Sequence, residues 1–475
     1  MGVVGKIRGG ITAWRKTRTV TLAVTGLSGS GKTAFITSAI ANLEATGRNP
    51  AAARWLNGLD VVDTARLCSA EQPPNYKPSH GRMFPLSDML AALTADTPRW
   101  PSRTANIYET AVDLRFWPGR RPARTDEPTA RLRLVFVDYP GEWLVDVPLL
   151  GQSYAEWSKA ALNRLESSPW SEISQKFRAL LETGGWTAYD NNESARQAAL
   201  EWQKVLVAAR SRGLKWLQPG QFIRKRDQPD EAAVPAIDEE PLWFCPLPEA
   251  PHMAAKRGSL AHGMAKRYSA YQKGVSAFFG NTLKDASHHL VLVDPLEALA
   301  EGESAFHETA EVLAEVYRVF ANRKSGFWSL LGRTGFDKLL LLATKADTVP
   351  PVQRAALKSL LAEMCTRRVV GAAGIAPPTA DYVAAIRATE DVEHEIEGGE
   401  RVRVVQGLCS EIGKMRRVTM INIPETMPEP DYFQRRAGIR TPRFVPPKVD
   451  GHGRYGIPNV RLGKVLDDLV GDLLQ

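Results

Sequence analysis

The chain has 475 residues, and its 61 lysines and arginines against 53 aspartates and glutamates give a formal net charge of +8. Hydrophobic residues make up 44% and charged residues 24%, which is typical of soluble globular proteins and excludes a disordered, collagen-like or disulfide-scaffold chain. The length predicts two or three domains, or one enlarged domain. The four cysteines lie far apart without a metal-ligand spacing, which favours a reducing compartment and argues against structural zinc.

The sequence contains no apolar run of the ~18 residues that a membrane span needs, and its N-terminal segment lacks the apolar region of a secretory signal. We therefore expect a cytoplasmic protein. Residues 1–18 are basic and contain no acidic residue. They form either a frayed basic arm or an amphipathic helix on anionic lipid, so membrane association through basic segments stays open.

A β-type run over residues 19–25 leads into a glycine-rich segment, and helical spacing follows over 34–46. Further along, residues 105–116 and 131–138 flank a turn-rich connector and predict a β-hairpin. Helical patterns then dominate residues 143–287 and are interrupted by a Pro-rich acidic loop.

Strand character returns after this helical block and alternates with helices. The predicted strands are 289–294, 337–343 and 381–386, and the predicted helices are 304–322 and 351–364. A polar hairpin over 392–407 and a closing amphipathic helix over 460–474 follow. The pattern predicts an α/β fold with a mostly parallel sheet and a helical block inserted in the middle.

We divide the chain into five parts. In chain order they are a basic arm, the first part of the sheet domain, the helical insertion, the second part of the sheet domain, and a basic extension with the closing helix. Their bounds are 1–18, 19–142, 143–287, 288–424 and 425–475.

The strongest motif is GLSGSGKT at residues 26–33, which has the GxxxxGKT pattern of a P-loop between a predicted strand and a predicted helix. Its small residues let backbone N–H groups point at phosphate oxygens, and the helix N-terminus adds favourable partial charge. Lys32 reaches the β- and γ-phosphates, and the Thr33 hydroxyl is expected to ligate Mg²⁺. The predicted nucleotide contacts are Gly26, Ser28, Gly29, Ser30, Gly31, Lys32, Thr33 and Ala34.

The residues DYPG, from Asp138 to Gly141, end the strand predicted over 131–138. In P-loop proteins an acid in the place of Asp138 holds a water of the Mg²⁺ shell, and the N–H of a glycine in the place of Gly141 bonds the γ-phosphate. Glu142 follows where many GTPases carry a water-orienting glutamine. Its carboxylate either accepts a hydrogen bond from that water, with a like-charge repulsion that predicts slow turnover, or caps the next helix.

The residues TKAD, from Thr344 to Asp347, close a predicted buried strand where a nucleotide base would lie. Asp347 can accept hydrogen bonds from guanine N1–H and N2–H₂, which adenine does not offer. The Lys345 stem would cover the base and ribose, and Thr344 stands where asparagine is commoner. After the last predicted strand, the Ala388 N–H is a candidate donor to guanine O6.

A P-loop, a hairpin ending in DxxG, a strand, TKxD and a final strand loop follow one another in the order of a Ras-like G domain. The segments GLSGSGKT, DYPGEWLVDVPLL, LLATKAD and GIPNVRLGKVLDDLVGDLL also resemble the YcjX-like family of bacterial P-loop proteins, and the similarity runs from about residue 20 to the end. The resemblance implies a P-loop NTPase with a Ras-like G domain, a large α-helical insertion after switch II, binding of GTP and GDP, and a link to stress responses.

Switch I is expected just before the strand predicted over 105–116. We choose Thr104 as the residue that senses Mg²⁺ and the γ-phosphate. The alternatives for this sensor are Ser102 and Thr97. Arg103 is a candidate arginine in cis that stabilises transition-state charge, and Trp100 would flank the ribose or phosphates, whereas the competing interpretation is a basic surface loop. The catalytic candidates are thus Lys32, Arg103 and Glu142, and the metal candidates are Thr33, Thr104 and Asp138.

Residues 435–464 hold eight basic residues against one acid, Asp450. A tail that wraps the sheet domain is favoured over contact with RNA or acidic lipid, so we expect no nucleic-acid partner. The leading hypothesis is a GTPase switch with bound GTP or GDP and Mg²⁺, slow hydrolysis, and an effector protein contacted through the helical insertion. The alternatives are a nucleotide-binding module without significant hydrolysis and an ATPase, against which TKAD argues.

Overall fold

The structure is a computed structural model of the chain. The residues that it describes are 17–27, 29–102, 106–119, 128–223, 240–249, 255–324, 326–366, 375–395, 399–419, 422–435, 442–450 and 454–475.

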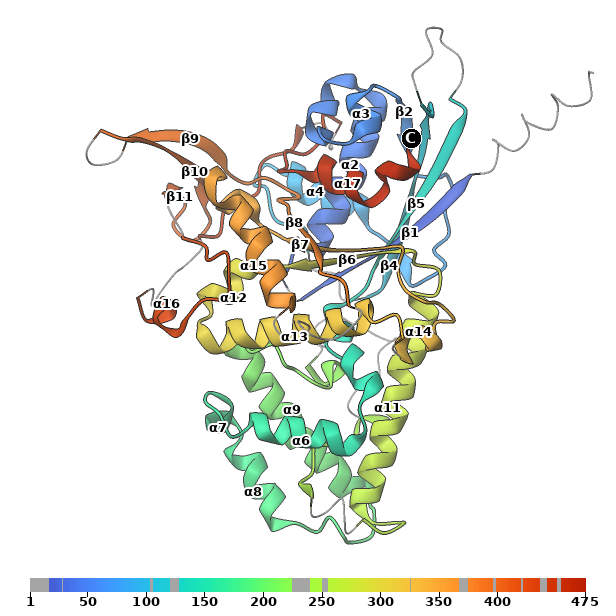
Figure 1. The fold of residues 1–475 in the computed structure, drawn as a ribbon, viewed down its shortest axis with the longest axis vertical. Coiled ribbons are helices and arrows are strands. Elements are labelled where there is room, and N and C mark those ends of the chain that lie inside the picture. Colours follow the sequence, from blue (N-terminus) through green and yellow to red (C-terminus); the bar gives the residue numbers. More distant parts are fainter. Residues whose placement is uncertain are drawn as a thin grey trace, which may run out of the picture.

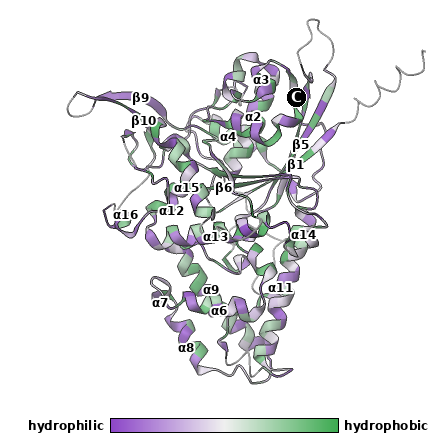
Figure 2. Ribbon diagram, viewed as in Figure 1, coloured by the Kyte–Doolittle hydropathy of each residue, from purple (hydrophilic) through white to green (hydrophobic). Residues whose placement is uncertain are grey.

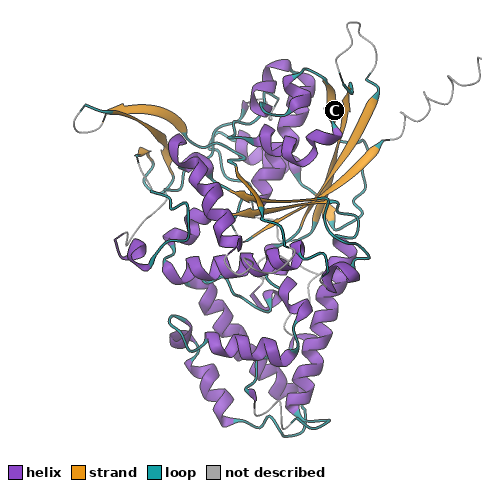
Figure 3. Ribbon diagram, viewed as in Figure 1, coloured by secondary structure: helices purple, strands orange, loops and turns teal. Residues whose placement is uncertain are grey.

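A mixed, parallel-rich β-sheet forms the centre of the molecule (Figures 1 and 3). Its strands, in spatial order, are β2 (Leu67–Glu71), β4 (Tyr108–Phe116), β5 (Ala130–Asp138), β1 (Arg18–Gly26), β6 (His288–Val293), β7 (Lys338–Ala343) and β8 (Thr379–Tyr382). β1 is parallel to both β5 and β6, and β7 and β8 continue in parallel. β4 is antiparallel to β5 and β2 to β4, and the short β3 (Arg82–Met83) pairs with β4.

The strands predicted for this sheet correspond to β1, β4, β5, β6, β7 and β8, but β8 ends at Tyr382, so most of the strand predicted over 381–386 lies beyond it. The predicted hairpin is the antiparallel pair β4–β5, in which Tyr108 lies opposite Asp138. The edge strands β2 and β3 were not predicted, because β2 is short and largely half-buried and β3 has two exposed residues. The prediction of an α/β protein with a mostly parallel sheet is confirmed.

Helices cover both faces of the sheet (Figure 1). Side chains alternate between the faces along β1, so that Leu22 and Val24 enter one core and Ala23 enters the other. The first core is covered by α2 (Lys32–Arg48), η2 (Pro50–Leu56), α3 (Asp60–Asp63), α4 (Leu86–Thr94) and α17 (Leu462–Val470). The second is covered by α12 (Pro295–Ala300), α13 (Glu303–Ala321), α14 (Gly326–Leu330) and α15 (Arg354–Thr366).

A helical block lies between β5 and β6 in the sequence and extends from the second face of the sheet in Figure 1. Its elements are α5 (Gly141–Leu144), η3 (Val147–Gly151), α6 (Tyr154–Arg164), α7 (Trp170–Ile173), α8 (Gln175–Thr183), α9 (Asn192–Ser211), η4 (Gly220–Ile223), η5 (Glu240–Leu242) and α11 (Leu260–Thr282). These helices carry both hydrophilic and hydrophobic positions (Figure 2). Ser153 and Glu156 form a capping box that begins α6.

The interior of this helical block is aromatic and continuous with the core under the sheet. Trp157, which is 1% exposed, packs against Phe244 and Tyr268, with ring centroids 5.5 and 5.2 Å apart. The same core includes Ala23 of β1 and Val291 of β6. The helical block is therefore joined to the sheet by shared packing rather than by a flexible linker alone.

A second, three-stranded antiparallel sheet projects from the molecule beside α15 (Figures 1 and 3). Its strands are β9 (Glu390–Glu395), β10 (Arg401–Cys409) and β11 (Lys414–Val418). The predicted polar hairpin corresponds to β9 and β10, whereas β11, which is almost wholly exposed, was not predicted. The remaining elements are η6 (Ala346–Thr348), η7 (Pro351–Gln353), α16 (Pro430–Arg435) and η9 (Gly471–Leu473).

The C-terminal helix α17 closes the first face of the sheet against an early part of the chain. A Cβ on Gly463 would lie 2.2 Å from the Leu56 carbonyl oxygen, so the helix approaches η2 at backbone contact. The Arg66 guanidinium donates a 2.7 Å hydrogen bond to the carbonyl of Leu474. Several tail cations form ion pairs, among them Arg461 with Asp381 and Lys448 with Asp96.

The predicted basic arm lies almost entirely outside the described residues. Within the described ranges, no helix is both long and apolar enough to cross a bilayer.

Candidate nucleotide-binding site

The glycine-rich loop joins β1 to α2 in the strand–loop–helix arrangement of a P-loop. A Cβ on Gly26 would lie 2.2 Å from the Leu292 carbonyl oxygen, so only glycine allows β1 to approach β6 this closely. Gly29 and Gly31 have φ values of 85° and 86°, in the left-handed region, and α2 begins at the next residue, Lys32. Lys32 Nζ donates a 3.1 Å hydrogen bond to the Gly26 carbonyl and thus lies over the loop. Ser28 lies outside the described residues.

The DYPG segment lies beside this loop because β5 and β1 are parallel neighbours. The Tyr139 N–H bonds the Val24 carbonyl at 3.2 Å, and a Cβ on Gly141 would lie 2.1 Å from the Gly26 carbonyl oxygen. Asp138 is 1% exposed and Thr33 is 9% exposed. The backbone at Gly141 is therefore in contact with the first residue of the P-loop, and any larger residue there would separate the two segments.

The two predicted base-binding loops meet at Asp347 and Ala388. The Ala388 N–H donates a 2.8 Å hydrogen bond to Asp347 Oδ2, and the Thr389 hydroxyl donates a 2.5 Å bond to the Asp347 carbonyl. Asp347 is 4% exposed. Burial raises its pKa to about 6, although the Ala388 N–H opposes this shift.

Lys345 and Thr344 occupy the turn before Asp347. Thr344 Oγ1 donates a 3.0 Å hydrogen bond to the Val293 carbonyl and so joins the ends of β7 and β6. Lys345 has a φ of 57°, and its ammonium pairs with Asp294 and lies 3.8 Å from Glu297. Burial alone would lower the pKa of Lys345, but these two carboxylates raise it above the usual lysine value. The lysine is thus held as a cation beside the base loop.

Comparison with known proteins gives the chain its family. The family model described as the YcjX-like family, DUF463, matches residues 20–474. The chain belongs to the YcjX-like family. A protein named Ras-like GTPase YcjX from Escherichia coli is 31% identical over 470 residues, which cover 96% of each chain. Another of the same name, from Shewanella oneidensis, is 30% identical over 475 residues, covering 96% of this chain and 95% of the relative.

The predicted switch I of this YcjX-like chain is described only in part. Arg103 and Thr104 lie outside the described residues. Trp100 is 45% exposed, and its indole N–H donates a 2.8 Å hydrogen bond to the Phe444 carbonyl, which ties the loop to the C-terminal extension. Ser102 Oγ lies 3.9 Å from Met89 Sδ, and Thr97 is exposed. Among the described residues of this loop, Trp100 and Ser102 contact Phe444 and Met89 rather than the glycine-rich loop.

Glu142 is the second residue of the short helix α5, directly after Gly141, and this segment packs against the helical block. A Cβ on Gly220 would lie 2.1 Å from the Glu142 carbonyl oxygen. The neighbouring Trp143 stacks on Phe278 of α11, with centroids 3.8 Å apart and rings 5° from parallel. The Asp146 carboxylate accepts hydrogen bonds from the Tyr271 hydroxyl at 2.5 Å and the Gly220 N–H at 2.9 Å. In this YcjX-like chain the segment after DYPG is therefore fixed to helices outside the predicted nucleotide site.

Sequence reasoning missed three residues that support the base loops, namely Asp294, Arg354 and Asp391. Asp294 follows the buried strand β6 and precedes a proline, a pattern of a helix cap that could have drawn attention to it. Arg354 and Asp391 had no motif to mark them, because their pairing depends on how α15 and β9 meet.

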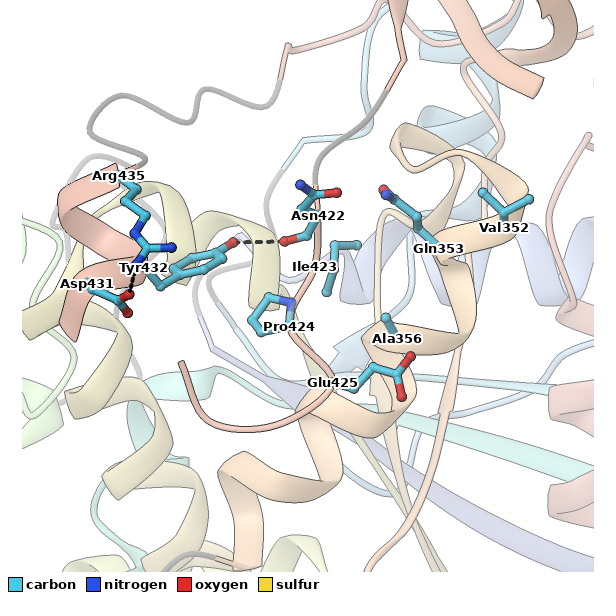
Figure 4. A pocket seen from close by; sticks show the side chains of 10 residues that line it. All are labelled: Val352, Gln353, Ala356, Asn422, Ile423, Pro424, Glu425, Asp431, Tyr432 and Arg435. Atoms are coloured by element: carbon cyan, nitrogen blue, oxygen red, sulfur yellow. Dashed lines mark hydrogen bonds and ion pairs between the residues drawn. The ribbon is translucent and has the colours of Figure 1, made fainter. Parts of the chain in front are cut away.

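A hollow of about 600 Å³ lies between η7, α15, residues 422–425 and α16 (Figure 4). In Figure 4 the Tyr432 hydroxyl bonds the Asn422 carbonyl across it, and Arg435 pairs with Asp431. As the structure describes it, its lining includes none of the residues predicted to bind nucleotide, so we do not assign it to that site.

Proposed function

We propose that this protein binds GTP and GDP with Mg²⁺, hydrolyses GTP slowly, and works as a molecular switch. Support comes from three loops at the carboxyl ends of parallel strands of one sheet, where α/β proteins bind ligands. The P-loop follows β1, DYPG follows β5 and TKAD follows β7. The two relatives named Ras-like GTPase YcjX, each similar over nearly its whole length, support the same activity.

The pair formed by Asp347 and Ala388 is the observation on which the choice of guanine rests. Guanine presents the acceptor O6 next to the donor N1–H. The protein presents the complementary order, the Ala388 N–H donor 2.8 Å from the Asp347 Oδ2 acceptor. Adenine presents a donor and then an acceptor at the corresponding positions, so it would leave both protein groups unpaired in a buried site. The proposal is that guanine displaces the bond between Asp347 and Ala388 and takes one partner from each.

At the phosphate end, the backbone N–H groups of residues 29–33 and the start of α2 favour negative charge. Lys32 would exchange its bond to the Gly26 carbonyl for the β- and γ-phosphates. The hydroxyl of Thr33 and the carboxylate of Asp138 supply the hard oxygen donors that suit Mg²⁺, and Thr104 is the candidate third group. Magnesium would neutralise charge on the β- and γ-phosphates.

Hydrolysis would pass the γ-phosphoryl group to water, with GDP and inorganic phosphate as products. Glu142, which follows Gly141, would accept a hydrogen bond from that water, and Arg103 is the candidate that stabilises the charge leaving toward the β-phosphate. A carboxylate repels the γ-phosphate more than an amide would. We therefore propose turnover slower than that of GTPases with glutamine in this position.

Single-turnover assays with labelled GTP and ATP test this function. The proposal expects tight binding of GTP and GDP, weak binding of ATP, and slow release of phosphate from GTP. Tight GTP binding without phosphate release would support the binding-module alternative, whereas equal use of ATP would support an ATPase.

The switch role rests on the contacts of the segment after DYPG with the helical block. Trp143 stacks on Phe278 and Asp146 accepts a hydrogen bond from Tyr271, and both partners belong to α11. A change at the γ-phosphate would therefore be transmitted to α11 and would alter a surface offered to an effector protein. A part in a bacterial stress response is the process that the family resemblance suggests. Recovery from heat or envelope stress by cells lacking the gene, with and without the Lys32→Ala variant, would test it.

A further inference from the structure

Arg354 of α15 lies beneath the TKAD turn and is 7% exposed. Its Nε atom donates hydrogen bonds of 3.0 Å to two backbone carbonyls, those of Ala346 and Val349. These carbonyls stand one residue before and two residues after Asp347. One guanidinium therefore fixes the turn on both sides of the predicted base-binding carboxylate.

The other edge of the same guanidinium reaches the second base loop. Its two terminal nitrogens bond the two carboxylate oxygens of Asp391 at 2.5 and 3.3 Å. Asp391 Oδ2 also pairs with Arg387 at 2.9 Å, and Arg387 Nε donates a 2.8 Å hydrogen bond to the Thr389 carbonyl. Asp391 thus joins α15 to the loop that presents the Ala388 N–H.

These contacts close into a ring around the predicted guanine-binding pair. The ring runs from the TKAD turn through Arg354, Asp391 and Arg387 to Thr389, whose hydroxyl returns to the Asp347 carbonyl at 2.5 Å. Planar guanidinium groups bonded at both edges hold a fixed geometry better than a lysine would. The side chain of Asp391 is only 29% exposed, so solvent weakens the pair less than at an open surface.

We propose that Arg354, Asp391 and Arg387 are positioning residues that hold Asp347 and Ala388 in register for guanine, and so set guanine selectivity and the rate of nucleotide release. The inference rests on the proposed function. These three residues touch the loops rather than the nucleotide. A pair that serves only fold stability would lower binding of every nucleotide alike, whereas positioning residues act on the part of the affinity that the base supplies.

Dissociation of fluorescent GDP and competition by GDP and ADP test this assignment in the full-length protein. Asp391→Asn keeps the size of the side chain and removes its charge. It should release GDP roughly tenfold faster, in line with coupling energies between contacting residues, and should leave the weak ADP affinity unchanged. Arg387→Gln should likewise accelerate GDP release and leave ADP affinity unchanged. Glu393→Gln, which changes the same charge two residues further along β9 opposite Arg403, is the matched control.

A double-mutant cycle separates positioning from general loosening. In an Asp347→Ala background, Asp391→Asn should not accelerate release further, because the group that it positions is gone. Full additivity, or an equal loss of GDP and ADP affinity, would overturn the assignment. If Asp391→Asn does not fold, as judged by thermal melting, GDP release and ADP competition measured with Arg387→Gln test the same assignment. GDP binding by the wild type with unchanged release from both variants would overturn this inference alone, whereas no GDP binding by the wild type would overturn the proposed function as well.

Discussion

The carboxylate of Asp347 is buried. Among the described residues, the hydrogen bond that it accepts from another residue comes from the Ala388 N–H. Its role in guanine recognition can be tested by changing one atom. Asp347→Asn turns an acceptor into a donor, so GDP binding should weaken roughly tenfold or more, the usual scale for a lost charged hydrogen bond. Xanthosine diphosphate, whose position 2 carries an acceptor, should gain relative affinity. Calorimetry with both nucleotides decides the matter, and unchanged GDP preference in the variant would contradict the assignment.

The same carboxylate predicts a pH dependence of binding. Burial raises the pKa of Asp347 to about 6, and only the ionised form accepts hydrogen bonds from guanine N1–H and N2–H₂. GDP affinity should therefore fall by about tenfold for each pH unit below 6, while ADP affinity changes little. The folding stability of the nucleotide-free protein depends on pH in the opposite direction. Because the folded-state pKa lies above the unfolded value, this group favours the fold below the unfolded pKa, and the contribution is lost as pH rises through about 6.

Titration of GDP affinity between pH 5 and pH 8 checks the binding part of this prediction. The Asp347→Asn variant is the control, since it has no proton to lose and should show a flat profile. If GDP affinity of the wild type varied with pH as little as that of Asp347→Asn, the predicted role of the Asp347 proton would be contradicted.

In the proposed function, Lys32 is the phosphate contact that would be hardest to replace. Lys32→Ala should abolish measurable triphosphate binding, because one cation among closely spaced phosphate charges has no substitute nearby. Thr33→Ala should lose Mg²⁺ dependence and keep weaker diphosphate binding. Lys159→Ala, at an exposed position, serves as the control for loss of a lysine charge. Wild-type GTP affinity in Lys32→Ala would rule out the P-loop interpretation.

At this scale the sequence predicted the residues that lie on short linear motifs. Gly26 ends β1, and Lys32, Gly141 and Asp347 each lie a few residues after a strand of one parallel-rich sheet, so a motif and the strand before it suffice to predict the edge of the sheet that they occupy. The supporting residues Arg354 and Asp391 are 37 positions apart and belong to α15 and β9. Their pairing is a product of tertiary packing, which no local pattern in one sequence reveals.

The strand-and-helix elements were predicted best where hydrophobic spacing is strong. The buried run of β6 and the helix α13 were placed to within a few residues of their observed bounds. The exposed strand β11 escaped prediction because its residues pair with β10 without facing a core.

Switch I is the element on which the catalytic proposal depends. We expect Arg103→Ala to keep GDP affinity near the wild-type value and to slow single-turnover GTP hydrolysis by at least about tenfold, since an arginine that meets charge developed in the transition state acts on kcat. Arg99→Ala, an exposed arginine on the same loop, is the matched control. An unchanged rate would return Arg103 to a surface role, and a large loss of GDP binding would make it a ground-state phosphate ligand.

Across the whole molecule, the stack of Trp143 on Phe278 joins the nucleotide edge of the sheet to α11. Phe278→Ala should leave GDP affinity near the wild-type value and reduce the difference in hydrogen exchange of the helical block between the GDP and GTP-analogue states. Lys273→Ala, on an exposed part of α11, should preserve that difference. An undiminished difference in Phe278→Ala would show that the block senses the nucleotide by another route.

Burial of Asp146 raises its pKa to about 7 at the same junction, which indicates that the closed packing of the helical block against α5 is maintained at an electrostatic cost. The sequence indicated a helical block in this part of the chain from its helical spacing. It gave no indication that Trp157 and Val291 belong to one continuous core, because contacts between segments so far apart depend on the final fold.

The closure of α17 on η2 has a consequence for synthesis of the protein. One core holds Leu56 and Phe35 from the beginning of the chain together with Leu462 and Leu469 from its last part, and β1 requires β6, which is made only after the helical block. A ribosome-bound chain that has already exposed the P-loop strand cannot complete the core of its first face until the final turns emerge. Sheets built from such distant segments fold slowly and leave apolar strands uncovered meanwhile. We therefore expect the first face of the sheet to stay sensitive to protease until α17 has emerged, and a ribosome-release assay of protease resistance would detect a late, single acquisition of structure.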